Sequence, residues 1–120
     1  MTTILVVEDV ALNRDLLAQL LEDEHRLLFA EDGIAALELA VREQPQLILM
    51  DLSLPSMDGY EATRRLKADA ATARIPVIVL SAHAMKGDEE HARDAGCDDF
   101  LTKPVDEALL FAAIARHLGR

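Results

Sequence analysis

The sequence predicts an α/β domain built on a five-stranded parallel sheet, doubly wound so that helices cover both of its faces. Two observations lead to this fold class. Short runs rich in β-branched residues and leucine alternate with longer helical patterns along all 120 residues. Each intervening helix is long enough for a crossover, which parallel neighbours need and antiparallel neighbours do not. The length is close to the commonest size of a single domain, and we expect one domain spanning residues 1–120.

The expected strands are short apolar runs, near residues 3–8, 25–30, 46–51, 76–81 and 98–102. The expected helices fill the gaps between them, near residues 11–23, 33–43, 58–68, 84–95 and 106–118. Apolar residues at helical spacing mark the first two helices: Leu16, Leu17, Leu20 and Leu21, then Ile34, Leu37 and Val41. No linker, internal repeat or low-complexity stretch interrupts the alternation.

The last three helices differ in their character. Asp58, with Glu61 three residues later, has the pattern of a capping box, so we assign Asp58 to capping rather than to chemistry. Asp106 is well placed to cap the fifth helix. The fourth helix, which contains Gly87, is polar and has few apolar residues, as expected of a switching element of low local stability. The fifth is apolar nearly all round, so we expect the face of helix four, strand five and helix five to meet a partner or a second copy of the chain.

The order of the strands places acidic residues at one point of the sheet. Right-handed crossovers with helices on both faces favour the order 2-1-3-4-5, the flavodoxin-like arrangement. In such sheets the ligand crevice lies beyond the carboxyl ends of the strands, where the winding reverses. For this order the reversal falls between strands one and three. Glu8 and Asp9 end the first of these strands and Asp51 ends the other, so topology and residue chemistry indicate the same place.

Composition excludes several classes of protein. The formal net charge of −10 leaves no excess of Lys and Arg for binding nucleic acid. The single cysteine, Cys97, cannot form an intramolecular disulfide and is compatible with a reducing cytoplasm. No apolar stretch approaches the length of roughly 18 residues that a membrane span requires. The chain starts directly with a strand-like segment, so we expect no signal peptide, no membrane insertion and a cytoplasmic location.

The three carboxylates predict a magnesium site. Two carboxylates 4 Å apart repel by about 1 kcal/mol in bulk water and by several times more near a protein surface, and a bound cation relieves this. Mg²⁺ takes oxygen ligands, typically one or two protein carboxylates together with waters and phosphate oxygens. We expect Asp9 and Asp51 to bind Mg²⁺ directly, Glu8 to act through water, and the backbone carbonyl of Ser53 to complete the set.

A carboxylate beside such a cation can act as a nucleophile and form an aspartyl phosphate, and Asp51 is the candidate. Phosphoryl transfer depends mainly on positioning and on neutralising charge. The Lys103 ammonium could pair with one phosphoryl oxygen, and the Ser81 hydroxyl could donate a hydrogen bond to another. Pro104 directly follows Lys103, and we hypothesise a cis peptide bond between them that aims the amine inward.

These residues resemble the receiver domain of two-component response regulators. The resemblance covers essentially the whole chain and rests on motifs in the order of the family: Glu8-Asp9, Asp51 to Gly59, Ser81-Ala82, and Phe100 to Pro104. It implies that Asp51 is the phosphoacceptor, that Glu8 and Asp9 hold Mg²⁺, and that Ser81 and Lys103 bind the phosphoryl group. It also implies that Phe100 is an aromatic switch residue, which turns inward when Ser81 moves toward the phosphate.

The resemblance extends to partners. It implies a phosphoryl group taken from phosphohistidine on a histidine kinase or a histidine phosphotransfer protein, and output through contact with a downstream protein. Residues 85–90 and Gly96-Cys97 look similar to single-domain cell-cycle regulators and to receivers of hybrid kinases, although Val10 stands where hybrid-kinase receivers often carry Asn. The domain would catalyse only its own phosphorylation and dephosphorylation, so it is not predicted to be an enzyme. It could be a stand-alone protein or part of a hybrid protein.

The histidines show no metal-ligand spacing, and we expect all four at the surface: His25, His83, His91 and His117. His83 lies two positions after Ser81, where it could influence dephosphorylation.

Three alternative functions share either the fold or part of this chemistry. A phosphatase of the haloacid dehalogenase type also forms an aspartyl phosphate, but it needs a second Asp where this chain has Ser53. A flavin-binding carrier would need a hydroxyl- and glycine-rich phosphate loop after the first strand, and residues 10–13 offer none. A pseudo-receiver would bind partners without being phosphorylated, but its acidic pocket would normally be broken, and this one is intact.

Overall fold

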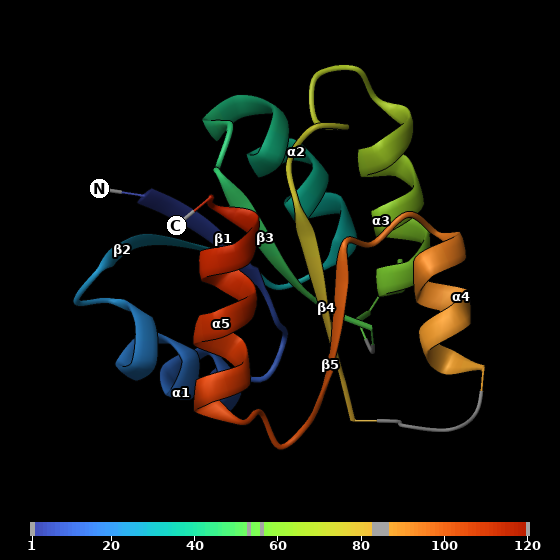
Figure 1. The fold of residues 1–120 in the computed structure, drawn as a ribbon. Helices are drawn as coiled ribbons and strands as arrows, with labels where there is room; N and C mark the ends of the chain where they lie inside the picture. Colours follow the sequence, from blue (N-terminus) through green and yellow to red (C-terminus); the bar gives the residue numbers. More distant parts are fainter. Residues whose placement is uncertain (1, 53, 56, 83–86, 120) are drawn as a thin grey trace.

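The computed structural model describes residues 2–52, 54–55, 57–82 and 87–119. Strands and helices alternate from one end of the chain to the other (Figure 1). The strands are β1 (Thr2–Val7), β2 (His25–Ala30), β3 (Leu47–Asp51), β4 (Val77–Ser81) and β5 (Asp99–Thr102). The helices are α1 (Ala11–Leu21), α2 (Gly33–Glu43), α3 (Gly59–Ala68), α4 (Asp88–Asp94) and α5 (Glu107–His117).

The sheet has the predicted order, β2-β1-β3-β4-β5, and all neighbouring strands are parallel. Its register brings Val7 beside Met50, Asp51 beside Leu80, and Ser81 beside Thr102. All five residues of β3 and all five of β4 are buried, because helices cover both faces of a parallel sheet. This explains why both strands are apolar up to their last residues, Asp51 and Ser81. The parallel pairing of the two strands places their carboxyl ends at one edge.

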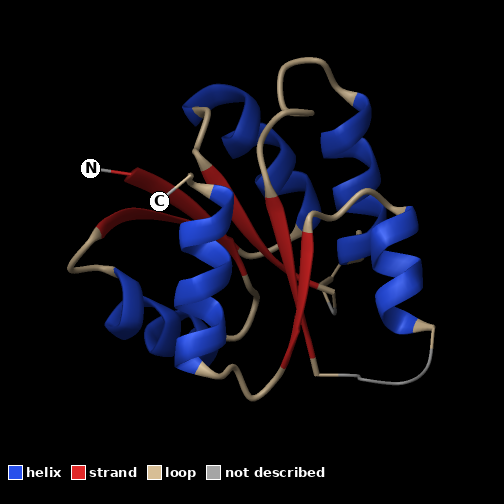
Figure 2. Ribbon diagram, in the orientation of Figure 1, coloured by secondary structure: helices blue, strands red, loops and turns tan. Residues whose placement is uncertain are grey.

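The helices form two layers, with the sheet between them (Figure 2). Helices α1 and α5 pack on one face, where Leu17, Leu21 and Leu110 meet side chains of β1, β3 and β4. Helices α2, α3 and α4 pack on the other face, where Ala36 and Leu66 meet the alternate residues of the same strands. Within the described residues, no helix has the length and apolar character needed to span a lipid bilayer.

The two predicted helix caps are present, and the start of one helix differs from the prediction. The Asp58 carboxylate accepts a hydrogen bond from the Glu61 N–H at 2.9 Å, and Asp106 accepts one from the N–H of the third residue after it. Helix α4, however, does not include Gly87, which was predicted to lie inside it. Gly87 has a φ of +101°, a left-handed conformation that ends helical geometry, so the helix begins at Asp88. Residues 84–86 of the predicted helix lie outside the described residues.

Helix α4 is thinly anchored. Ala92 is its buried residue, and the Tyr60 ring from α3 stacks on the His91 ring with centroids 4.0 Å apart. Helix α5 shows the apolar surface that the sequence predicts, since Leu109 is 59% exposed and Phe111 is 43% exposed. Little buried area in α4 and an unburied apolar face on α5 give the α4-β5-α5 surface two properties of a contact region.

Charged side chains tie the elements together at the edge opposite the carboxyl ends. Asp98 accepts hydrogen bonds from the Lys67 ammonium and from the Val77 N–H, both at 2.8 Å. Asp99, at the start of β5, forms an ion pair with Arg116 near the end of α5. The prediction that the histidines lie at the surface is wrong for His25, which is buried at the start of β2 next to Thr2 in the register. His83 lies outside the described residues.

Candidate functional site

The site forms where the carboxyl ends of β1, β3, β4 and β5 meet. Glu8 and Asp9 directly follow β1, Asp51 and Ser81 are the last residues of β3 and β4, and Lys103 directly follows β5. Glu8, Asp51 and Ser81 are buried, whereas Asp9 is exposed at the mouth. The parallel sheet thus gathers five residues that are spread over 96 positions of the sequence, from 8 to 103.

Lys103 is the centre of the charge arrangement. Its ammonium lies 2.8 Å from Glu8 Oε1 and 3.4 Å from Asp51 Oδ1. The side chain of Lys103 is 21% exposed, while those of Glu8 and Asp51 are 2% and 8% exposed. The Lys103 N–H donates to the Ser81 carbonyl at 2.7 Å, and the bond to Pro104 is cis, as hypothesised from the sequence. One half-buried cation therefore balances two buried carboxylates.

The three carboxylates are close enough to share a cation. One oxygen each from Glu8, Asp9 and Asp51 lies within 4.8 Å of the other two. The other Glu8 oxygen, Oε2, accepts a hydrogen bond from the Val10 N–H at 3.2 Å. A compact set of carboxylate oxygens, with one member open to solvent, fits the preference of Mg²⁺ for oxygen ligands and retained waters. The predicted fourth ligand, the carbonyl of Ser53, lies outside the described residues.

The surroundings of Glu8 and Lys103 shift the pKa of both groups. Burial raises the pKa of the Glu8 carboxyl, but the hydrogen bonds from Lys103 and from the Val10 N–H outweigh this, so its pKa lies below the ordinary value. Burial lowers the pKa of the Lys103 ammonium, but the two carboxylates, Glu8 and Asp51, raise it by more, so its pKa lies above the ordinary value. At neutral pH both groups are charged, which keeps the ion pair intact.

Gly59 fixes the backbone behind Asp51. A Cβ atom at this position would lie 2.3 Å from the Asp51 carbonyl oxygen and 2.7 Å from the Leu52 Cα, so only glycine fits without a shift of the backbone. The Gly59 N–H donates to the Leu52 carbonyl at 3.0 Å. Because α3 begins at Gly59 with Asp58 as its cap, the start of α3 is locked against the end of β3.

The predicted switch pair lies on neighbouring strands. Ser81 is the buried end of β4, and Phe100 lies in β5 beside Val79. The Phe100 ring is half-buried against the core cluster beneath α2, α3 and α4. It is therefore neither fully buried in the core nor fully exposed to water.

Arg14 is a residue of the site that the sequence analysis missed. It is the fourth residue of α1, and its Nη1 donates to the Glu8 carbonyl at 2.9 Å. One signal in the sequence could have pointed to Arg14, namely a cation close to the start of a predicted helix. The positive end of the helix dipole disfavours a cation there. A cation at such a place indicates a local partner that compensates.

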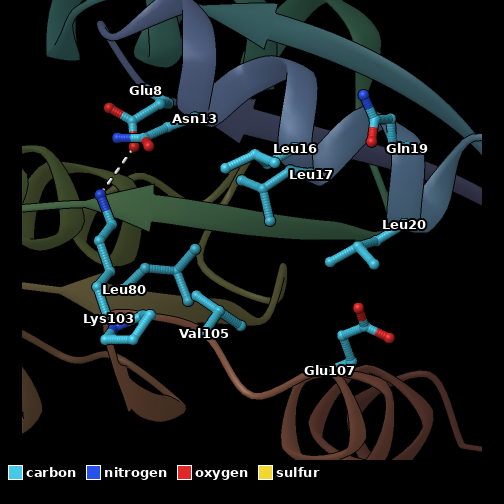
Figure 3. A pocket seen from close by; sticks show the side chains of 11 residues that line it. Glu8, Asn13, Leu16, Leu17, Gln19, Leu20, Leu80, Lys103, Val105 and Glu107 are labelled. Carbon is cyan, nitrogen blue, oxygen red and sulfur yellow. Dashed lines mark hydrogen bonds and ion pairs between the residues drawn. The ribbon is translucent and has the colours of Figure 1, made fainter.

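An elongated cleft opens beside the Glu8–Lys103 pair, between α1 and the segment that joins β5 to α5 (Figure 3). Its volume is about 350 Å³. Apolar side chains of α1 face Leu80 and Val105 across it, and polar groups lie at its ends. The full lining is Glu8, Asn13, Leu16, Leu17, Gln19, Leu20, Leu80, Lys103, Pro104, Val105 and Glu107.

Comparison with known protein families shows which family the chain belongs to. The family model of the response regulator receiver domain matches residues 4–115. The chain belongs to the response regulator receiver family. The match includes every predicted site residue, from Glu8 to Lys103, and it agrees with the resemblance seen in the sequence motifs.

Relatives of this receiver have known names and structures. It is 42% identical over 118 residues to the response regulator PleD of Caulobacter vibrioides, of which it spans 26% of the length. It is 40% identical over 118 residues to the polar-differentiation response regulator DivK of Brucella anthropi, with 98% of this chain and 96% of DivK covered. The receiver domain of the sensor histidine kinase PA1611 from Pseudomonas aeruginosa, solved with a magnesium ion in its active site cleft, superposes with a TM-score of 0.92 at 38% identity, covering 99% and 98% of the two chains.

Proposed function

We propose that this receiver accepts a phosphoryl group on Asp51 from a phosphohistidine and passes the signal on by protein contact. The observation that carries the proposal is the Lys103 ammonium, held between the carboxylates of Glu8 and Asp51 at 2.8 Å and 3.4 Å. A cation at this position faces the atom that would gain the phosphoryl group. The same arrangement argues against a pseudo-receiver, in which the acidic pocket has no reason to stay intact.

In the proposed step, an Asp51 carboxylate oxygen attacks the phosphorus atom of the phosphohistidine. The new O–P bond forms as the P–N bond breaks, and the electron pair of that bond leaves with the imidazole of the donor. Lys103 pairs with a phosphoryl oxygen, and the Ser81 hydroxyl donates to another, so that both stabilise the charge on the transferred group. Hydrolysis by water returns inorganic phosphate and the free Asp51 carboxylate. No separate substrate is turned over, so we propose a signalling module rather than an enzyme.

The carboxylates of Glu8, Asp9 and Asp51 would hold the Mg²⁺ that this chemistry requires. Asp9 and Asp51 would bind directly and Glu8 through water, because Glu8 already accepts hydrogen bonds from Lys103 and the Val10 N–H. A bound Mg²⁺ supplies positive charge that reduces repulsion between the attacking carboxylate and the incoming phosphoryl group. The magnesium ion reported for the PA1611 receiver supports this assignment.

The proposed donor is a histidine kinase or a histidine phosphotransfer protein. A phosphohistidine on a protein can reach Asp51 only if its carrier also covers the surface around the site. The cleft between α1 and the β5–α5 segment lies directly beside the Glu8–Lys103 pair and offers apolar side chains for such a contact (Figure 3). We propose a cytoplasmic location, because kinases that depend on ATP work there.

The proposed output is the α4-β5-α5 surface. An acyl phosphate adds about −1.5 to −2 charges beside Ser81 and Lys103, which would draw both side chains toward it. Movement of Ser81 would open space for the half-buried Phe100 ring, and the thinly anchored α4 would respond. The exposed apolar side chains of α5, Leu109 and Phe111, would then contact a downstream protein or a second copy of the chain.

A direct test is phosphorylation by a small donor. The chain is incubated with acetyl phosphate and Mg²⁺, and its intact mass is measured. We expect a gain of one phosphoryl group that is lost in Asp51→Asn and in the absence of Mg²⁺. Asp58→Asn is the matched control, because this carboxylate lies seven positions away and caps α3, a task that Asn also performs. A mass gain that persists in Asp51→Asn, or no gain in the unaltered chain, would overturn the proposal.

A further inference from the structure

Arg14 bridges three segments around the acidic pair. It lies in the first turn of α1, and its Nη1 donates to the Glu8 carbonyl at 2.9 Å. Its Nη2 lies 3.2 Å from Glu31 Oε1, in the segment between β2 and α2. The Arg14 side chain is 20% exposed, whereas that of Glu31 is 70% exposed. The Arg14 side chain is therefore mostly buried, with one contact to the backbone of Glu8 and one to an exposed carboxylate.

The bonded carbonyl belongs to the peptide unit that joins Glu8 to Asp9. The other side of Glu8 is also held, because its N–H donates to the Ala30 carbonyl of β2 at 2.9 Å. Rotation of the Glu8–Asp9 peptide plane would redirect the Asp9 side chain and would break the bond to Arg14. The hydrogen bond from Arg14 thus holds the peptide unit from which the Asp9 side chain projects.

Asp9 needs such support from its backbone. In the described part of the chain, no hydrogen bond or ion pair holds its side chain, and it is exposed. Glu8, in contrast, is fixed by Lys103 at 2.8 Å and by the Val10 N–H at 3.2 Å. Of the two acidic residues after β1, the one proposed as a direct ligand is thus the one whose side chain has no hydrogen bond or ion pair to orient it among the described residues.

The location of Arg14 is unfavourable for a merely solvated surface cation. The first turn of a helix repels positive charge, and an ion pair with a largely exposed partner such as Glu31 contributes little. The planar guanidinium places its two terminal nitrogens on two partners at once, Nη1 on the Glu8 carbonyl and Nη2 on the Glu31 carboxylate. A lysine would keep the charge there and lose this geometry.

We propose that Arg14 is a positioning residue for the cation site: it holds the Glu8–Asp9 peptide so that the Asp9 carboxylate faces Asp51. This inference rests on the proposed Mg²⁺ site and extends it to a residue that touches neither the cation nor the phosphoryl group. Residues that orient metal ligands typically change metal affinity by about 10-fold to 100-fold when replaced.

Two substitutions separate geometry from charge. Arg14→Lys keeps the positive charge but loses the fork, and Arg14→Gln loses both. If Arg14 acts by positioning, both variants bind Mg²⁺ more weakly, by about tenfold, near the lower limit for residues that orient metal ligands. If it acted only through its charge, Arg14→Lys would bind like the unaltered chain and Arg14→Gln would bind more tightly, because a cation repels Mg²⁺.

The experiment is calorimetric titration of the full chain with Mg²⁺, with Glu31→Gln as the matched control. That control removes the outer anchor and should weaken binding by less than about threefold, because exposed ion pairs contribute little. Thermal unfolding of each variant identifies the temperature at which all are folded, and Arg14→Lys carries the test if Arg14→Gln does not fold. A merely structural role would lower the unfolding temperature and leave the Mg²⁺ affinity of the folded chain unchanged.

The outcomes separate the positioning role of Arg14 from the Mg²⁺ site itself. Weaker binding in Arg14→Lys and Arg14→Gln, with Glu31→Gln close to the unaltered chain, supports the positioning role. Unchanged binding in Arg14→Lys, or tighter binding in Arg14→Gln, overturns it while the Mg²⁺ site stands. Absence of Mg²⁺ binding by the unaltered chain overturns the metal site itself, independently of the Arg14 variants.

Discussion

Replacement of Lys103 by methionine should destabilise the fold at neutral pH. The ammonium balances Glu8 and Asp51, whose nearest candidate ligand oxygens lie within 4.8 Å of each other. Without it, two unit charges at that separation repel by about 3 to 4 kcal/mol at an effective dielectric constant of 20. Movement of the side chains and access of water reduce this repulsion. We therefore expect Lys103→Met, which keeps the length of the side chain, to lower the free energy of unfolding by about 2 kcal/mol at pH 7.

The loss should depend on pH with a defined sign. In the unaltered chain the pKa of Glu8 is lower in the folded than in the unfolded state, so its stabilising contribution is present above the unfolded pKa and is lost as pH falls through the folded value. Without Lys103, the burial that raises the pKa of Glu8 loses its main counterweight, so protonation of the buried carboxyl at lower pH reduces the destabilisation of the variant. The difference in stability should narrow as pH falls from about 7 toward about 4, the ordinary range of a Glu carboxyl.

Urea unfolding with and without Mg²⁺ measures the loss of stability in Lys103→Met directly. Mg²⁺ should restore part of the lost stability in Lys103→Met, because it supplies the missing positive charge and binds only the folded site. Arg65→Met is a suitable control, since Arg65 pairs at 3.4 Å with an exposed Glu61 and such pairs contribute at most about 1 kcal/mol. An unchanged midpoint at pH 7, or a loss that is constant with both pH and Mg²⁺, would refute the reasoning.

Three further substitutions test other parts of the structure. Gly59→Ala would place a Cβ 2.3 Å from the Asp51 carbonyl, so it should lower the free energy of unfolding by about 1 to 3 kcal/mol in urea and slow phosphorylation by acetyl phosphate. Lys67→Met removes the 2.8 Å hydrogen bond to Asp98, and a loss of stability of about 1 to 2 kcal/mol is expected; equal stability would contradict a role in joining α3 to β5. His91→Ala removes a ring stack worth about 0.5 to 1.5 kcal/mol, so amide exchange should accelerate in α4 and not in α1.

The sequence was sufficient to predict the topology because the pattern of the strands determines it. Apolar runs alternating with helices leave few arrangements, and right-handed crossovers select among them. The same rule predicted that residues as distant as Glu8 and Lys103 would meet, and they lie 2.8 Å apart. Caps were predictable because they depend on local hydrogen bonds, as at Asp58 and Asp106.

The sequence was insufficient where side-chain conformation or tertiary packing decides. The partner of Arg14 is the carbonyl of a residue six positions earlier, which depends on the angle at which α1 leaves β1. The start of α4 depends on the left-handed φ of Gly87. The sequence does not reveal this φ, because glycine also occurs inside helices. His25 is buried because β2 places it against the core, a consequence of strand position that its polarity does not reveal.

The way α4 rests on the domain also bears on how its specificity could evolve. Among the described residues, the helix and its cap contribute two alanine side chains to the interior, Ala92 and Ala95. Methyl groups make few shape-dependent contacts, so substitutions elsewhere on α4 leave the interior unchanged. If α4 contacts a downstream protein as proposed, its outward positions other than His91 can therefore be exchanged between paralogues to recognise new targets, without compensating substitutions in the sheet beneath.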